Sequence, residues 1–285
     1  MYTEEITKLS ESAKNFYHII DSILQPRGLN AAIVDAHKKI IDSYIERTDI
    51  DAFTKAAFVS SYKRIVKEYA SCAKTIKMAE AFVSEDAQPE KVEEDWFAFF
   101  FDKVKIVTNE AVLNMWSRVL AGEVNKPGSF SRSLLHTLSI MSSTQAELFC
   151  NISRFCMYEY KNEDVVIPLI FIASNVEAYE DSRITEEGLF ELENLGLIQC
   201  DFKDEFVFLK KKVLRFGNKV LEIYGDPDNQ DKIKVGNVKF TDNGLALFKI
   251  VGESYKKYRV DILNFAITKL QRRNCKIIMN NKLVP

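Results

Sequence analysis

The chain has 285 residues, of which 47% are hydrophobic and 28% charged, and its net charge is −2 at pH 7. This composition, with 10 glycines and 6 prolines, is typical of a folded protein and excludes a disordered chain. No apolar run approaches the ~18 residues of a membrane-spanning helix, and five scattered cysteines without a Cys-x-x-Cys pair exclude a disulfide framework. The N-terminus lacks the basic start and apolar block of a secretory signal, so we expect a cytoplasmic protein without membrane contact.

Charge is divided unevenly along the chain. Residues 200–285 contain 18 basic and 10 acidic side chains, whereas residues 1–199 contain 21 basic and 31 acidic ones. A basic end on an acidic body indicates an anionic partner or contact between the two halves. An ordinary solvated surface is the commoner explanation of such blocks.

Residues 1–84 are predicted to form an N-terminal helical bundle. Apolar residues recur at three- and four-residue spacing over 6–24 and again over 33–45, and the Pro-Arg-Gly at 26–28 ends the first of these helices. A third stripe, starting at Thr48 and Asp49, continues without a breaker to Phe82. Helical hairpins of this length often make subunit contacts, although a bundle core is the more usual role. The polar, acidic segment 84–94 is predicted to be a linker.

Residues 93–160 are predicted to form a second helical domain. Trp96 and Trp116 fall on apolar stripes and indicate core positions, and the phenylalanines at 97–101 wrap most of one helix. The helix that contains Trp116 is expected to end at Gly122. The expected helix caps are Asp95, Asn109 with Thr108, Ser131 or Ser133, and the run from Ser142 to Thr144, in which Ser143 has the spacing of a capping box with Ala146 and Glu147.

Residues 161–285 are predicted to form an α+β module. Gly217-Asn218 is a hairpin signal between two strand-like segments, and Thr241 is expected to cap a helix. Segment 165–171 is expected to be a short strand or a buried segment. The other expected strands are 197–198 onward, 206–209, 213–216, 219–224, 233–240 and 275–279, and the expected helices are 181–194, 241–251 and 260–270.

This order of elements resembles a winged helix, with the helix from Thr185 to Asn194 in the recognition position. That helix contains Glu186, Glu187, Glu191 and Glu193, which disfavour a phosphate-lined groove. The basic residues lie on the following hairpin, so a nucleic acid is expected to bind there. The same order of elements also suits a module that binds only protein.

The sequence contains no recognisable catalytic or metal site. None of the histidines, His18, His37 and His136, has a metal-ligand partner at a suitable spacing. A phosphate-binding glycine loop, a Gly-x-Gly-x-x-Gly fingerprint and a Gly-x-Ser-x-Gly elbow are absent. We therefore expect no enzyme activity, no metal and no cofactor, with a site assembled from distant residues as the remaining alternative.

The segment 116–131 has the pattern of a tight corner between two helices. Ala121 and Gly122 allow close approach, Pro127-Gly128 reverses the chain, and a serine caps the next helix. Arg118 and Glu123 are expected to form an ion pair or to bind backbone ends. A structural corner is the first interpretation, and a ligand or partner site is the second. The residues of that candidate interaction corner are Trp116, Arg118, Glu123, Pro127, Gly128, Ser129 and Ser131.

These residues also carry a family resemblance. Together with Glu94–Trp96 and Ala146–Phe149 they resemble the bacterial family labelled domain of unknown function 2806, which also occurs in prophages and mobile elements. Segments 192–198 and 240–247 are similar to later blocks of that family, so the resemblance covers roughly 93–250, and the N-terminal helices carry no matching motif. Leu134 stands where the family is expected to have threonine. The corner is also similar to abortive-infection alpha proteins of phage defence, and neither resemblance implies a catalytic residue.

The sequence therefore favours a non-enzymatic interaction protein, linked by resemblance to phage defence or mobile elements, with a protein partner or a second copy of itself. The alternative is a winged-helix-type protein that binds nucleic acid through its basic hairpin. The contacts expected for that alternative are Lys210, Lys211, Lys212, Arg215 and Lys219.

Overall fold

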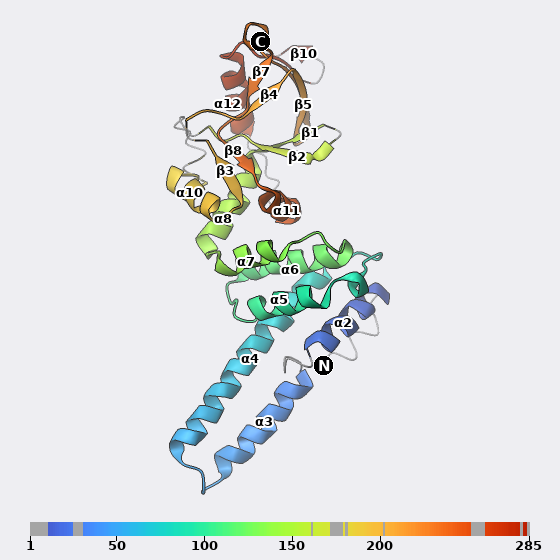
Figure 1. Cartoon of the computed structure of the whole chain (residues 1–285), viewed down its shortest axis with the longest axis vertical. Helices are drawn as coiled ribbons and strands as arrows, with labels where there is room; N and C mark the ends of the chain where they lie inside the picture. The colour runs from blue at the N-terminus through green and yellow to red at the C-terminus, as the bar shows by residue number, and fades with distance from the viewer. Residues whose placement is uncertain are drawn as a thin grey trace. The chain divides into compact units, whose positions relative to one another are not determined.

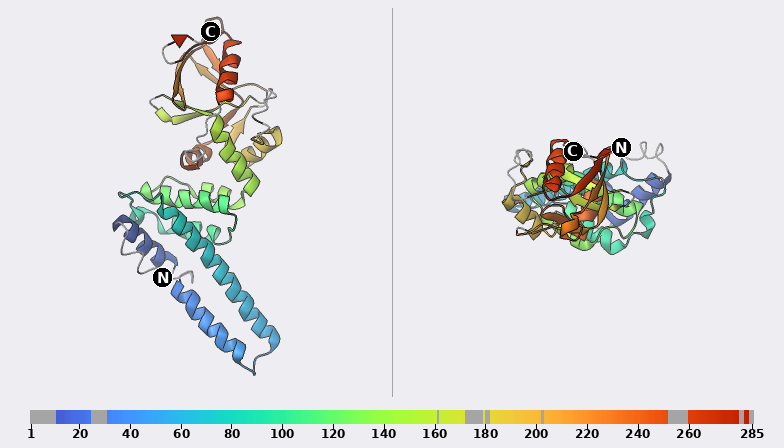
Figure 2. Two further views of the ribbon diagram at one scale, coloured as in Figure 1. Left: turned by 180° about the vertical axis from the view of Figure 1, so that it is seen from behind. Right: turned by 90° about the horizontal axis from the view of Figure 1, so that it is seen from above.

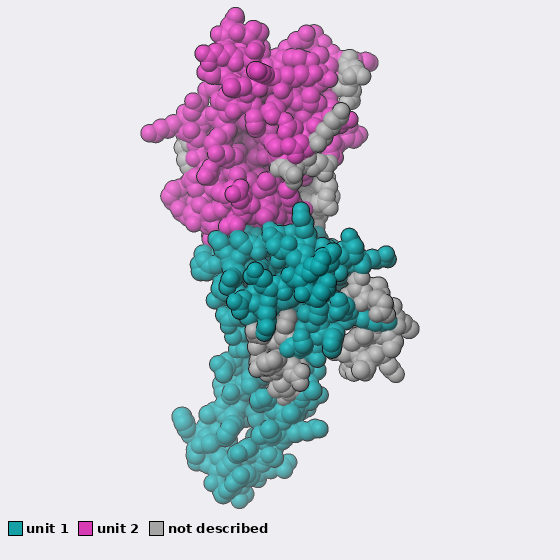
Figure 3. Space-filling model, turned by 45° about the vertical axis from the view of Figure 1, so that its right-hand side comes forward, with its two compact units in different colours: residues 1–140 teal, residues 141–285 magenta. Residues whose placement is uncertain are grey.

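The structure is a computed structural model, and it describes residues 11–24, 31–160, 162–171, 179, 182–201, 203–251, 260–279 and 282–283. The chain divides into two compact units, Met1–Ile140 and Met141–Pro285 (Figure 3). The first is helical and the second combines helices with antiparallel sheet, so a mainly α chain with a C-terminal α+β part is confirmed. The boundary between the two units falls between Ile140 and Met141 along the chain. The expected division into 1–84, 93–160 and 161–285 stays a prediction.

Unit 1 contains a helical hairpin joined to a compact group of helices. In Figure 1, α3 and the first half of α4 lie side by side, away from the other helices of this unit. α2 packs on α5, and the C-terminal part of α4 packs on α6. The elements are α2 (Glu11–Leu24), α3 (Ala31–Glu46), α4 (Ala52–Glu80), η2 (Pro89–Lys91), α5 (Glu94–Val104), α6 (Glu110–Asn125) and α7 (Arg132–Ile140).

The helix starts in unit 1 follow local capping chemistry. Asn109 caps α6, and Ser131 Oγ accepts a hydrogen bond from Leu134 N at the start of α7, as predicted. Two predictions were wrong. Asp95 lies in the first turn of α5, and the capping position is taken by Glu93, whose side chain makes no capping bond. α4 begins after Asp51, whose carboxylate accepts from Thr54 N, and not at residues 48–49.

The segment predicted as a linker, 84–94, is packed against the end of α6. Gln88 N donates to Val124 O at 2.7 Å, and Ser84 N donates to Asn125 Oδ1 at 2.8 Å. Pro89 is buried. These contacts are possible because α6 continues through Gly122 to Asn125, one turn beyond the predicted end. The helix break expected of Gly122 is therefore wrong.

An aromatic cluster forms the core of unit 1. Trp96 stacks on Phe100 with ring centroids 5.2 Å apart, and Trp116 meets Phe100 edge to face at 5.1 Å. Phe97 and Phe101 are also fully buried, which confirms that α5 is a central helix and that both tryptophans are core residues. This rigid core holds the start and end of the corner at 116–131.

Unit 2 combines helices with a small, curved antiparallel sheet. Its main sheet has the strand order β10-β9-β6-β5-β1-β2, and two further pairs are β3 with β8 and β4 with β7. Figure 2 (left) shows α12 beside the curved sheet, where it packs on β9. The elements are α8 (Ser143–Ile152), η3 (Ser153–Phe155), β1 (Cys156–Glu159), β2 (Asn162–Pro168), α10 (Glu186–Asn194), β3 (Ile198–Cys200), β4 (Val207–Leu209), β5 (Lys211–Phe216), β6 (Lys219–Tyr224), η4 (Pro227–Asn229), β7 (Lys232–Lys234), β8 (Val238–Phe240), α11 (Asp242–Val251), α12 (Val260–Gln271), β9 (Lys276–Met279) and β10 (Lys282–Leu283).

Strands β3 to β8 form one long ribbon that is interrupted twice. The pairs β3–β8, β4–β7 and β5–β6 are nested, with the turn predicted at Gly217-Asn218 at the closed end. The single strand predicted over 233–240 is wrong, because it divides into β7 and β8 around Gly236, which has a φ of 114°. A Cβ at Gly236 would lie 2.6 Å from the carbonyl oxygen of Ile170, so only glycine allows the two segments to cross.

Helix capping in unit 2 also differs from prediction at one helix. The run from Ser142 to Thr144 caps α8 as predicted, but the capping box joins Ser142 to Gln145, and not Ser143 to residues 146–147. Thr241 caps α11 as predicted, and Thr185 caps α10, which starts five residues later than predicted. The predictions for residues 6–10, 26–28 and Asp181 fall outside the described residues.

Candidate interaction surfaces

Glu123 organises the corner at 116–131 by accepting backbone hydrogen bonds. Its Oε1 accepts from Gly128 N at 2.6 Å and its Oε2 from Phe130 N at 2.8 Å. The residue is only 2% exposed, and burial raises the pKa of its carboxyl above the ordinary 4.5 even though the backbone donors act in the opposite direction. The side chain therefore binds backbone ends, one of the two alternatives predicted for it.

Arg118 binds elsewhere. Its Nε donates to Asn114 Oδ1 at 2.9 Å, and its guanidinium lies 4.1 Å from the centroid of the Phe82 ring. Trp116 is completely buried, and its Nε1 has no hydrogen-bond partner within the described part of the chain. A partner protein cannot reach Trp116 or Glu123 in this conformation.

The rest of the corner reinforces the same turn. Ser129 Oγ donates to Lys126 O at 2.6 Å, and Trp96 Nε1 donates to Phe130 O at 2.7 Å. Gly128 has a φ of 82°, which favours glycine after Pro127. Gly128 and Ser131 are exposed. These contacts support the structural interpretation of the corner, and its role as an interaction site stays a prediction.

The basic β-hairpin (β5–β6, with Lys210 before it) lies inside a sheet. β5 pairs with β1 at Leu214 and Arg215, and β6 pairs with β9 over its last four residues, so a neighbouring strand covers part of each long edge. A projecting wing would leave both edges open. The hairpin predicted to act as a wing is therefore an internal part of the six-stranded sheet.

Three of the five predicted nucleic-acid contacts are already engaged. Lys211 Nζ lies 2.6 Å from Glu222 Oε2, and Lys212 Nζ lies 2.6 Å from Glu159 Oε1. The hydrogen bond with Glu222 raises the pKa of Lys211 and lowers that of Glu222. Arg215 lies over the Tyr158 ring at 5.3 Å. Lys210 is exposed and Lys219 half-exposed. Glu222 and Glu159, which pair with Lys211 and Lys212, reduce the attraction that this surface can offer to phosphate groups.

The outer face of α10 combines acidic residues with one exposed phenylalanine. Glu186, Glu187, Phe190 and Glu191 share this face because they recur at three- and four-residue spacing, and all are exposed. Phe190 is 55% exposed, and Gln145 Nε2 donates to Glu191 Oε2 at 3.1 Å. The acids of this face were recognised in the sequence, whereas Phe190 was not. The available signal was that Phe190 lies off the apolar stripe of this helix, whose members Leu189 and Leu192 are buried.

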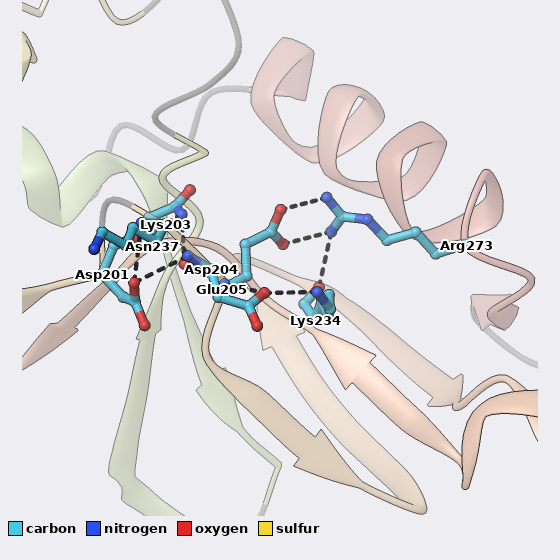
Figure 4. A network of polar contacts seen from close by, with 7 residues as sticks. All are labelled: Asp201, Lys203, Asp204, Glu205, Lys234, Asn237 and Arg273. Atoms are coloured by element: carbon cyan, nitrogen blue, oxygen red, sulfur yellow. Dashed lines mark hydrogen bonds and ion pairs between the residues drawn. The ribbon is translucent and has the colours of Figure 1, made fainter.

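A polar network holds the first break of the ribbon, between β3–β8 and β4–β7 (Figure 4). Asn237 Nδ2 donates to Asp201 O and to Asp204 O at 2.9 and 2.8 Å. The Arg273 guanidinium forms a two-pronged ion pair with Glu205, and its Nη1 also donates to Lys234 O at 3.3 Å. All these polar groups are satisfied within the network, so it fixes the fold at this point.

Across the described ranges, no group of three His, Cys, Asp or Glu side chains could hold a metal ion. Burial raises the pKa of Cys72 and of Cys200 to about 12, so these thiols stay protonated at neutral pH and are poor nucleophiles.

In the part of the chain that is described, no helix has both the length and the apolarity that a membrane crossing requires.

Comparison with known proteins identifies the family. A family model described as "Protein of unknown function (DUF2806)" matches residues 62–264, which is most of the chain. The chain belongs to this family. The match starts at Tyr62, inside α4, so it extends further towards the N-terminus than the motifs recognised in the sequence. Comparisons with curated proteins and with solved structures gave no match.

Proposed function

We propose that this family member acts by binding another protein, without catalysing a reaction, and that the outer face of α10 is the binding surface. The observation that carries the proposal is Phe190, which is 55% exposed among the exposed carboxylates of Glu186, Glu187 and Glu191. A large exposed aromatic side chain within a charged rim is typical of a protein contact.

The chemistry of this face selects the kind of partner. Removing a phenylalanine side chain from water contributes about 1.5–3 kcal/mol, and the surrounding carboxylates attract lysine or arginine while they repel phosphate. Glu186 and Glu187 are also favoured by the helix dipole, because they lie in the first turn. The dipole does not account for Phe190. The face therefore suits a cationic protein segment with one apolar anchor.

The surrounding elements support a winged-helix-like core for unit 2. α10 packs on α8 and on β3, β3 pairs with β8, and α11 follows β8 directly. In a winged helix that reads DNA, the helix in the position of α10 enters the groove. Here that helix presents acids and Phe190. We propose that the module keeps the arrangement of a winged helix and uses its recognition position for protein.

Nucleic-acid binding through the basic β-hairpin is the competing proposal. Lys210 and Lys219 support it, whereas the ion pairs of Lys211 and Lys212 weaken it.

The family resemblance suggests where the protein acts in the cell. We propose that the protein works in the bacterial cytoplasm, in phage defence or on a mobile element, where abortive-infection alpha proteins offer the analogy.

A binding titration separates the two proposals. The full chain is titrated with a fluorescent peptide that contains arginines around a central leucine, and separately with duplex DNA, at two salt concentrations. We expect salt-sensitive binding of the peptide only, weakened about tenfold by Glu187→Lys and by Phe190→Ser. Glu147→Lys, at an exposed position of α8, is the matched control for charge. Tight, salt-sensitive binding of duplex DNA, lost in Lys210→Ala with Lys219→Ala, would favour the competing proposal instead.

A further inference from the structure

The strand pair β4–β7 in unit 2 has one occupied edge and one open edge. The occupied edge belongs to β7, whose outward carbonyl groups both accept hydrogen bonds. Lys232 O accepts from Asp226 N at 3.4 Å, and Lys234 O accepts from Arg273 Nη1 at 3.3 Å. The fold therefore protects β7 from pairing with a further strand.

The open edge belongs to β4, where Val207 and Leu209 turn their backbone groups away from β7. Phe206 N and Lys210 N donate to carbonyl groups of the opposite strand, at 2.8 and 2.9 Å. Successive residues of an antiparallel strand alternate in the direction of their backbone groups, so those of Val207 and Leu209 point to the other side. Within the described ranges, β7 is the one strand that pairs with β4. Two N–H and two C=O groups are thus available on this edge.

The same edge is closed further along the chain. Tyr160 N donates to Val213 O at 2.7 Å, and β1 pairs with β5 next to this contact. Val213 lies four residues beyond Leu209, so the backbone groups of both use the same side. The chain bends between them at Lys210, which has a φ of 67°. The edge at β4 is therefore the part of this ribbon that lies beyond the end of β1.

The side chains at the open edge are apolar and exposed. Val207 is 40% exposed and Leu209 is 59% exposed, whereas Ile233, opposite Phe208 on the other face, is completely buried. Proteins commonly protect an open edge with a charged residue or a proline in the strand, and Val207–Leu209 contains neither. An edge of this kind is a template for a further strand.

The charges beside this edge select the occupant. Lys232 and Lys234 of β7 lie opposite the two exposed residues of β4, and neither strand contains an acid. Lys234 is engaged by Asp204 at 2.6 Å, whereas Lys232 has no ion pair in the part of the chain that is described. Lys210, which follows β4 directly, is exposed. A second copy of the chain would bring lysines against lysines, which destabilises paired strands.

We propose that an extended acidic segment of another protein adds to β4 as a further strand. Its backbone pairs with the open N–H and C=O groups of Val207 and Leu209, and its carboxylates meet Lys232 and Lys210. A phosphodiester backbone lacks the donors that the two carbonyl groups require, so a peptide fits this edge better than a nucleic acid does. This surface goes beyond the proposed function, because the outer face of α10 attracts a cationic segment instead.

A peptide library tests the proposal on the full chain. The probe library contains peptides of about eight residues in which Asp or Glu alternates with Val, Ile, Leu or Phe, and the comparison library has Lys in place of the acids. We expect retention of the acidic library. The best peptide should bind about tenfold more weakly to Leu209→Pro, which removes the outward N–H, and to Lys232→Glu. Lys276→Glu, at an exposed position of β9, is the matched control for charge.

Methylation of the peptide backbone tests strand addition without relying on any variant of the chain. N-methyl groups on alternate residues remove the donors from one edge of the best peptide. One of the two alternate sets should bind about tenfold more weakly than the other. Equal binding of both sets, a basic library retained as strongly as the acidic one, or retention of neither library overturns the proposal. A wild-type chain that sediments as a dimer and is dissociated by Leu209→Pro also overturns it, because the occupant is then a second copy.

Discussion

The carboxylate of Glu123 accepts a hydrogen bond from the backbone N–H of Gly128 at 2.6 Å, and this contact joins the end of α6 to the turn before α7. Its other oxygen accepts from Phe130 N at 2.8 Å. One buried side chain therefore replaces the backbone partners that the turn at 126–130 lacks. The carboxylate of Glu123 therefore has a physical role in the corner at 116–131.

Replacing Glu123 by glutamine should destabilise unit 1. The amide keeps one acceptor oxygen but sets an NH₂ group against one of the two backbone donors, which leaves a buried N–H unsatisfied. We expect a loss of about 1–3 kcal/mol in the free energy of unfolding, measured by urea titration. Glu94→Gln, at an exposed position of α5, should change that free energy by less than about 0.5 kcal/mol. Equal effects at both positions would argue against the bonding described for Glu123.

The raised pKa of Glu123 predicts a pH dependence of stability. A carboxyl with a folded-state pKa above its ordinary 4.5 binds its proton more tightly in the folded chain. The free energy of unfolding should therefore fall as the pH rises from the ordinary pKa through the raised one, and should be level above it. The difference between the wild type and Glu123→Gln, measured by urea titration from about pH 4 to about pH 8, isolates this contribution. A difference that increases stability with pH would contradict the assignment.

Gly244 is predicted to tolerate no side chain. A Cβ there would lie 1.7 Å from the carbonyl oxygen of Leu197. Alanine in place of glycine favours a helix by about 1 kcal/mol, but overlap with a backbone atom outweighs that gain. Gly244→Ala should lower the melting temperature clearly more than Gly128→Ala, where the space is open and only a φ of 82° opposes the change. A stabilising Gly244→Ala would show that α11 is placed differently.

Arg273 should be more sensitive to substitution than its neighbour. Its planar guanidinium binds both oxygens of Glu205 and also Lys234 O, whereas a lysine could make only one of these contacts. Arg273→Lys should reduce the free energy of unfolding of the full chain by about 1–3 kcal/mol. Arg272→Lys, at an exposed position, serves as the control and should be nearly neutral. Urea titration of both variants gives the comparison.

Local signals in the sequence were enough to place many elements. Asn109, Ser131 and Thr241 cap the helices that they were predicted to cap, and Gly217-Asn218 forms the predicted turn. A cap or a turn depends on groups within a few residues, and these are visible in one sequence. The prediction that Asp95 caps α5 was wrong because acids occupy three consecutive positions there. The first of them, Glu93, has the extended backbone of the capping position.

Contacts between distant residues could not be predicted in this way. Lys212 pairs with Glu159, 53 residues away, so a hairpin that appears as a basic patch in the sequence is partly neutralised in the fold. Gly236 interrupts a predicted strand because Ile170 lies against it. Phe190 is exposed because the apolar stripe of α10 uses the other side of the helix, and that choice depends on where β3 and α8 pack. These three relationships decide the candidate surfaces.

Photocrosslinking from position 190 tests the central claim most directly. A photoreactive phenylalanine analogue is placed at residue 190 of the full chain in its native host, and at residue 106 as a control, since Ile106 is 66% exposed and Phe190 is 55% exposed. We expect a covalent adduct with a protein at position 190, which is absent at 106 and strongly reduced when Glu187→Lys is added. An adduct with nucleic acid, or no adduct specific to position 190, would contradict a protein-binding role for α10.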